Sequence, residues 1–425
     1  MRSPRATHNL VAVSANLAET ALNTEQTLDT TMLVEMGDIA NLEPRRENNA
    51  DEANGKEEAD TIYDLGSTAS MSWNNTKAQP QHFAFIMGFG LGAVSTAAAG
   101  AGYEHTITPI DGDLDASRSN PSFTLAQRIG KTILKRRFAS MVVDSFAATF
   151  AKDDWVKLTA SLKGTGKYTD SVVEETVSAM GDAVSLNLAA NGVNGATAQE
   201  RLDSIHQIRV ELSPGQWTEV VCTDVSAATP AVLTITAPSA VATVVNYKIL
   251  YAPTESGWMT FPNRVTESAL RVAQANLTVG GAWDGTSFVG GRAMNSELSS
   301  IEYSCNNNQQ VEFTPGAGDA YASRAYRDGR VQAVNLSREL RDFILQNYIN
   351  SNEYFGLHLI CVGKEFEAGQ NYQVEIILPK LGVLKSPISA NGKRLAEAGD
   401  LTVLEDATYG SAIVKVKNLV GGYAA

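Results

Sequence analysis

The chain has 425 residues, which is enough for two or three domains that each bury a core without disulfides or metals. Its formal net charge of −13 excludes a protein that grips nucleic acid through a basic footprint. Its 44% hydrophobic content and 34 glycines favour a folded, turn-rich β architecture over a helical bundle.

The first 30 residues are polar and lack strong periodicity. They predict an N-terminal arm, 1–30, that is ordered only by contact with another molecule. The basic start has no apolar run behind it, so we expect no signal peptide.

The next segment begins a unit that extends to about residue 200. An apolar strand is predicted at 32–36, a second strand at 70–73 and a helix at 81–87. Between the strands, 41–60 contains many charges and no aromatic or β-branched residue, which predicts a long solvated loop. Simple solvation is one explanation, but loops of this length within a domain are often functional.

The apolar stretch 83–102 has helical spacing at its start and five glycines, so we expect a short core helix and no membrane span. Strands are predicted at 103–108 and 122–127. Segments 139–150 and 155–162 alternate in side-chain character and predict a hairpin with one buried face.

A different kind of sequence follows a turn-rich linker at 191–197. Four short strands at regular spacing predict a small inserted β-sandwich of the Ig-like type, with domain limits 201–257. The four strands are expected at 208–212, 217–222, 231–236 and 244–251.

The last segment, 258–425, repeats the order of the first unit. After an extended hairpin at 278–292, it predicts a strand at 300–303, a polar loop, a strand at 331–336 and a helix at 340–345. Strand, loop, strand and helix thus occur twice, which indicates a duplicated β-rich unit.

No motif in the chain supports catalysis, so we expect neither an enzyme nor a cofactor or metal site. The glycine-rich 164–167 lacks the flanking residues of a phosphate-binding loop, and 111–115 lacks the glycine and final glutamate of a calcium loop. The basic run 131–137 has no interleaved aromatics and favours a solvated hairpin edge. The five histidines show no metal-ligand spacing, and the three distant cysteines are typical of buried reduced thiols in a cytoplasmic product.

Several short segments, taken in order, carry a resemblance to the tail tube (major tail) proteins of long-tailed bacteriophages. The resemblance covers most of the chain except about 203–253. It rests on the order and spacing of the segments more than on any single motif. The segments are 43–48 (EPRREN), 77–83 (KAQPQHF), 103–109 (YEHTITP), 121–124 (PSFT), 300–303 (SIEY), 306–308 (NNN) and 376–380 (IILPK).

The resemblance implies a mainly β protein with one helix per repeat: two tandem tail-tube β-sandwich domains, 31–200 and 258–425, plus the insert. Inner sheets of successive domains would form a barrel in a ring, and a long loop would reach the neighbouring ring. The expected contact residues, between rings or subunits, are Arg45, Arg46, Glu47, Asn48, Glu57, Glu58, Asn306, Asn307 and Asn308. For the three asparagines, an ordinary polar hairpin turn is the alternative.

The function implied is a structural virion protein whose stacked rings form the conduit for DNA ejection. Its partners would be further copies of itself, as a trimer with pseudo-sixfold symmetry or as a hexamer, the tape measure and tail completion proteins, and unspecifically the genomic DNA in transit. Assembly would take place in the host cytoplasm without a membrane. An acidic inner wall is expected to repel phosphates, and removing 45–58 is expected to prevent polymerisation but not folding.

A secreted adhesin or surface-layer subunit is the alternative, because such proteins also combine β-sandwiches with Ig-like inserts. A secreted protein is expected to carry the signal that this sequence does not show.

Overall fold

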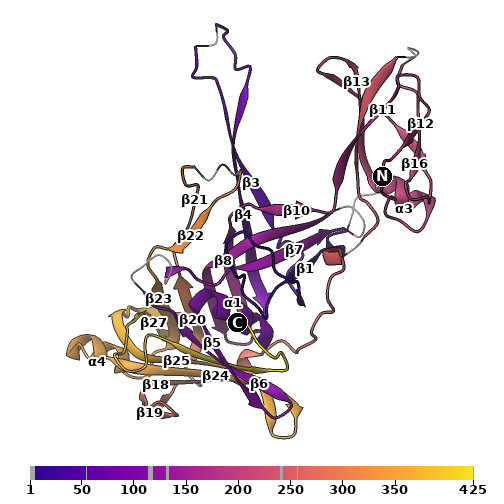
Figure 1. Ribbon diagram of the computed structural model, residues 1–425. Helices are drawn as coiled ribbons and strands as arrows, with labels where there is room; N and C mark the ends of the chain where they lie inside the picture. Colours follow the sequence, from indigo (N-terminus) through magenta and orange to yellow (C-terminus); the bar gives the residue numbers. More distant parts are fainter. Residues whose placement is uncertain are drawn as a thin grey trace. The chain divides into compact units, whose positions relative to one another are not determined.

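The computed structural model describes residues 5–53, 55–112, 118–130, 134–239, 243–255, 257–316, 318 and 320–424. The fold is mainly β, as predicted, and it divides into two compact units (Figure 1). The smaller unit comprises Met1–Ala12, Leu125–Arg137 and Tyr168–Asn263. The larger unit comprises Val13–Thr124, Phe138–Lys167 and Arg264–Ala425.

Three strands, β1, β7 and β8, have residues in both units, and the other elements belong to one. With these three, the elements of the larger unit are β1 Leu10–Val13, β2 Thr30–Met32, β3 Asn41–Asn48, β4 Ile62–Lys77, α1 Pro80–Leu91, β5 Gly92–Ala99, β6 Gly102–Pro109, β7 Phe123–Ile129, β8 Leu134–Ala151, β9 Lys157–Gly164, η3 Val272–Gln274, β18 Ala275–Trp283, β19 Phe288–Ala293, β20 Leu298–Asn306, β21 Gln309–Glu312, β22 Arg324–Arg327, β23 Val331–Glu339, α4 Ile344–Ser351, β24 Phe355–Glu367, β25 Gln370–Lys385, β26 Ile388–Asn391, β27 Arg394–Val403 and β28 Ile413–Asn418.

The core of the larger unit is built around helix α1, which is buried on every side. Pro80 suits the first helical turn because its missing N–H would have no helical partner there, and Gly92 ends the helix at φ 102°, which favours glycine. Phe85 and Phe89 both pack on Phe123, with ring centroids 4.9 and 5.0 Å away. The helix contacts β5, β6, β25 and β28 on one side and β9 on another, so it fills the space between layers. No helix in the described part of the chain is long and apolar enough to cross a membrane.

The duplicated order is present, with two shifts in position. The first strand of the first copy is β3, inside the predicted loop; the predicted strand at 32–36 is wrong, because β2 ends at Met32 and a loop follows. The second helix begins at Ile344, later than predicted, because the Asp342 carboxylate accepts from the Ile344 N–H at its start. α4 buries only Leu345, unlike α1.

The first eight residues of the predicted loop 41–60 form strand β3. β3 pairs with β4 from Asn41↔Ser70 to Asn48↔Ile62, so the segment is a long antiparallel hairpin. In Figure 1 this indigo-to-violet pair runs as a narrow ribbon past the other strands of its unit. The second copy has a hairpin at the same position in its order, β21–β22, and the Ser67 N–H donates to the Ala320 carbonyl at 2.8 Å between the two.

The predicted free N-terminal arm is wrong for the described residues. Val11, Val13 and Ala15 are fully buried, because the short apolar run of β1 packs into a core despite its polar flanks. Further along, the Glu19 carboxylate accepts hydrogen bonds from the hydroxyls of Ser122 and Thr124, at 2.9 and 2.6 Å. It also accepts from the N–H and hydroxyl of Ser140. This segment is therefore part of the domain.

The smaller unit contains the predicted inserted sandwich. Its elements are η1 Ala6–His8, β10 Tyr168–Asp170, β11 Val173–Met180, β12 Ser185–Asn187, α3 Ala198–Asp203, β13 Ile205–Ser213, β14 Gln216–Glu219, β15 Cys222–Val225, β16 Val232–Ile235, β17 Val244–Tyr251 and η2 Gly257–Met259.

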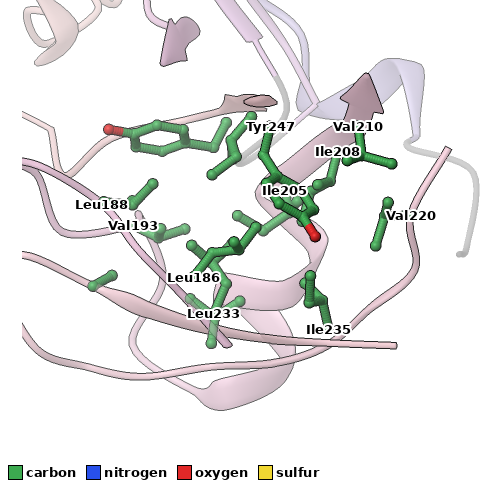
Figure 2. Close-up of a cluster of buried hydrophobic side chains, with 14 residues drawn as sticks. Leu186, Leu188, Val193, Ile205, Ile208, Val210, Val220, Leu233, Ile235 and Tyr247 are labelled. Atoms are coloured by element: carbon green, nitrogen blue, oxygen red, sulfur yellow. The ribbon is translucent and has the colours of Figure 1, made fainter. Parts of the chain in front are cut away.

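Two sheets, β11–β17–β13–β14 and β12–β16–β15, supply one apolar core. Figure 2 shows Leu186 and Leu233 of one sheet beside Ile205 and Tyr247 of the other. The predicted start at residue 201 is too late, because β11 pairs with β17 along its whole length. The earlier strands were missed because the insert begins before the turn-rich linker that we took as its boundary.

Candidate assembly surface

Two sheets join edge to edge inside the larger unit. The first has the order β3–β4–β9–β8. The second has the order β20–β23–β27, and the outer side of β27 pairs with β26 at one end and with the last residues of β25 at the other. β8 and β20 form the junction as an antiparallel pair, from Ala151↔Ser300 to Ser145↔Asn306. Each sheet comes from one copy of the repeat. The duplicated units therefore continue one surface, which we call the joined sheet.

The joined sheet has one buried and one open face because side chains alternate along each strand. Aligned residues on the buried face are Trp73, Ala160, Phe146 and Cys305. The Phe146 and Tyr303 rings meet across the junction at 6.0 Å. Aligned residues on the open face are mostly small and polar, as in Ser72, Ser161, Ser145 and Asn306.

The open face carries a balanced set of charges. Acidic side chains at its paired positions are matched by basic ones, and a shallow hollow of about 330 Å³ lies over the middle strands. The charged residues from β9 to β27 are Lys157, Lys163 and Arg394 against Asp144, Glu302, Glu339 and Asp400, and Lys163 pairs with Asp144 at 3.2 Å.

The two ends of the joined sheet are β3 and, beside β27, β26 together with the end of β25. Among the described strands, β3 pairs with β4 and β26 with β27, and neither has a partner on its other side. An unpaired strand exposes a row of backbone donors and acceptors that can pair with another chain. Sequence reasoning missed this arrangement; the one signal was the similar alternation in 145–151 and 300–306, which does not state that these strands are neighbours.

The predicted contact residue Asn307 is wrong. Its side chain is fully buried and donates to the carbonyls of Gly90 and Val143, at 2.8 and 3.1 Å. A residue buried and hydrogen-bonded in one chain offers no surface to another. Asn306 and Asn308 flank it in a turn, where the Asn306 side chain accepts from the Asn308 N–H, so they are also engaged locally.

Asn307 belongs to a cluster at the end of helix α1. Arg330 donates to the Leu91 carbonyl, the Ile110 carbonyl and the Asn307 side chain at 3.0–3.1 Å. A cation suits this place because carbonyls at a helix C-terminus carry partial negative charge. Burial lowers the pKa of Arg330, and the neighbouring Arg327 lowers it further. The cluster ties the second copy to the helix of the first.

The predicted contact residues in the β3–β4 hairpin are all exposed. Arg45 stacks on the Phe313 ring at 4.8 Å and Arg46 pairs with Asp64 at 3.4 Å, so both arginines also stabilise the hairpin base. Glu47 and Asn48 lie further out on β3. Glu57 and Glu58 lie in the tip, where Lys56 pairs with Asp60.

The motifs that failed as catalytic signals have structural roles where they are described. Lys167 donates to the Asn23 carbonyl at 2.8 Å and Thr165 is buried, so 164–167 does not form a phosphate cradle. Residues 113–117 of the acidic loop lie outside the described part, as do 131–133 of the basic run. The predicted solvated edge is wrong for the rest of that run, because Lys135 is buried, Arg136 stacks on Tyr168 at 4.7 Å and Arg137 stacks on Trp258 at 4.8 Å.

The cysteine and histidine side chains described next lie in structural surroundings. Burial raises the pKa of the Cys305 and Cys361 thiols to about 12, which leaves both unreactive. All three cysteines are free. Burial lowers the pKa of His82 to about 4, and His358 bonds Glu375 at 2.7 Å. Among the described residues, no group of three or more His, Cys, Asp or Glu side chains is arranged to hold a metal ion.

Comparison with known proteins adds little to this picture. No family model matches the sequence, and no curated protein matches it. A solved structure described as "Crystal structure of Hcp protein" aligns at 12% identity over 33% of this chain and 96% of that chain. The TM-score of 0.20 is too low to support an argument about fold or function.

Proposed function

We propose that the chain is the structural subunit of a self-assembling hollow tube of the tail-tube type, through which viral DNA is ejected. The observation that carries the proposal is the β8–β20 junction, where two copies of one β unit continue a single sheet. A third and later units added by the same rule would extend the surface until it closes. Closure removes the exposed sheet edges, which explains why both ends are left free in one chain.

The duplication fits a ring of three chains. Each chain would supply two of six equivalent positions, and the internal junction would alternate with a junction between chains. Six chains per ring is the alternative. In either case the smaller unit, with its own sheets and core, is an addition to the ring-forming part.

We propose that the open face of the joined sheet lines the lumen. Its small polar side chains would hold water and give DNA few groups to bind. The balanced charges replace our expectation of an acidic wall, because near-neutral charge neither binds a polyanion strongly nor repels it over the screening length of about 8–10 Å.

The remaining parts of the proposal follow from the resemblance. The tube would meet the tape measure protein and tail completion proteins, and it would be assembled in the host cytoplasm as part of the virion. It would have no catalytic role, and DNA would pass without specific binding.

Electron microscopy of the purified chain tests the proposal. Rings or hollow tubes are expected, with six similar density lobes around each ring. Flat two-dimensional lattices would instead favour a surface-layer subunit, and a monomer at every protein and salt concentration would contradict assembly altogether.

The β3–β4 hairpin is the part proposed to connect stacked rings. We expect that replacing 47–63 with Asn-Gly, so that the Arg46↔Asp64 pair closes a two-residue turn, leaves the fold and the rings intact but stops tube growth. The matched control replaces the exposed tip 284–287 of the β18–β19 hairpin with Asn-Gly, so that the Trp283↔Phe288 pair closes the turn, and it should form normal tubes. Normal tubes from the first variant would show that the hairpin does not bridge rings.

A further inference from the structure

Large apolar side chains are exposed at both free ends of the joined sheet. At the β3 end, the exposed fractions are 40% for Leu33, 59% for Met36 and 37% for Ile39. At the β26 end, they are 70% for Leu384, 43% for Ile388 and 55% for Leu395. We call these the first rim and the second rim. Exposed apolar groups gathered at a sheet edge indicate a surface that another protein covers.

The first rim lies along the outer side of β4. β3 covers β4 only from Ile62 to Ser70. Beyond that point the loop 33–40 takes its place, since the Asp38 carboxylate accepts from the backbone and side-chain N–H groups of Asn74 at 3.2 Å. β9 occupies the opposite side of β4, so this rim faces away from the joined sheet.

The second rim lies where the chain turns around the last strands of the second sheet. Leu384 is the extra residue in a bulge of β25, between Val383↔Leu401 and Lys385↔Asp400. Ile388 and Leu395 belong to the β26–β27 hairpin, whose β26 strand has no second partner among those described. The bulge and the short hairpin leave all three side chains without cover.

The internal junction shows what covers the equivalent place within the chain. There β20, the first strand of the second sheet, lies against β8 at the last position of the first sheet. Phe150 lies opposite Ile301, and both are buried. β3 occupies the first position of the first sheet, as β20 does in the second sheet. The end of β25 and β26 occupy the last position of the second sheet, as β8 does in the first sheet.

We infer that the second rim of one copy docks on the first rim of a second copy, so that Leu384, Ile388 and Leu395 cover Leu33, Met36 and Ile39. The occupant is another copy because the internal junction already joins these sheet positions. The contact is head to tail, since it unites two different surfaces, and it continues until rotation closes a ring. The inference rests on the proposed function, because it names the contact between chains of the ring.

Two complementary variants test the inference. Ile388→Glu with Leu395→Glu disables the second rim, and Leu33→Glu with Met36→Glu disables the first. All four side chains are exposed, so the single chains should fold, which circular dichroism and thermal unfolding check. Each variant alone is expected to be a monomer in size-exclusion chromatography with light scattering, where the unmodified chain forms rings.

Mixing the two variants gives the decisive result. Each retains the rim that the other lacks, so the mixture should form a one-to-one dimer and nothing larger. Val289→Glu is the control: Val289 is 55% exposed on β19, outside both rims, and this variant should assemble normally.

The outcomes separate this inference from the proposed function. If both variants still form rings, or if the folded variants do not dimerise when mixed, the rim contact is wrong and the tube proposal stands. If the unmodified chain forms only open head-to-tail chains and the mixture still dimerises, the rim contact is right and the tube proposal fails.

Discussion

Glu267 places a carboxyl group in the core beside the first turn of helix α1. Its Oε2 accepts from the Gln81 N–H at 2.8 Å, and its Oε1 has no hydrogen-bond partner. Burial raises the pKa of Glu267 to about 7, although the Gln81 hydrogen bond acts in the opposite direction. The group therefore binds a proton more tightly in the folded chain than in the unfolded chain, where its ordinary value is 4.5.

This shift predicts how stability changes with pH. Between about pH 4.5 and 7, folded Glu267 retains a proton that the unfolded chain has lost, so its contribution to the free energy of unfolding falls as pH rises. Glu267→Gln, which cannot ionise, should be more stable than the original chain at pH 8 by up to about 3 kcal/mol, and the difference should largely vanish near pH 4. Urea unfolding of both chains across this range measures it.

Comparing the two chains also removes the effect of His82. Burial lowers its pKa to about 4, so its contribution to stability rises with pH between about 4 and 6.5 and partly cancels that of Glu267. Glu353→Gln, at an exposed glutamate, should show no such difference. A pH-independent gap between Glu267→Gln and the original chain would contradict the assigned ionisation.

At the scale of elements, one buried arginine holds the second copy together. Arg338 on β23 is fully buried and meets three carboxylates: Glu297 at 2.9 Å, Glu397 of β27 at 2.7 Å and Asp342 at 3.0 Å. The Asp342 carboxylate accepts from the Ile344 N–H at the start of α4, and the Gln346 side chain in that helix donates to Glu397 at 3.1 Å. Two strands and a helix therefore share one charged centre.

Arg338→Met should destabilise the chain strongly. It leaves the fully buried Glu397 without its cation, which costs about 3–5 kcal/mol in comparable buried pairs. Arg394→Met removes an exposed partner of Glu339 and should cost less than about 1 kcal/mol. Thermal and urea unfolding compare the two. Similar losses of unfolding free energy in both variants would show that burial of the ion pairs does not determine their contribution to stability.

The elements that sequence reasoning predicted correctly are those with strong local patterns. The apolar run after Pro80 gave helix α1, and the alternation in 139–150 and 155–162 gave the β8–β9 hairpin. The predicted contact at Asn307 and the predicted strand at 32–36 were wrong because the local sequence patterns there do not distinguish these positions from others. A buried asparagine serves distant carbonyls, and the apolar residues at 33–39 belong to a rim that leaves them exposed.

At the scale of the whole molecule, the duplicated order could be read from the sequence, but its geometric meaning could not. Whether two copies stand apart or share a sheet depends on long-range pairing, which short periodic patterns do not encode. The β8–β20 junction unites strands about 150 residues apart in the chain. The two rims could not be predicted for the same reason, because a side chain at a sheet edge is exposed only where no other segment of the chain packs against that edge.

The sandwich between Val173 and Tyr251 of the smaller unit should be dispensable for the fold and assembly of the larger one. It has a separate core, and its outer strands return to the same place, since Val173 and Tyr251 are directly paired. We expect that replacing 174–250 with two glycines leaves the larger unit folded, because a short link spans the distance between paired strands, about 5 Å. Circular dichroism and electron microscopy should show a folded chain that still forms rings or tubes.

The control for this excision keeps the same linker and adds Ile388→Glu with Leu395→Glu. It should fold but not assemble, because both side chains are exposed at the second rim. If the excised chain folds but does not assemble while the unmodified chain does, the smaller unit is itself part of the assembly contact. In that case ring formation would depend on surfaces outside the joined sheet.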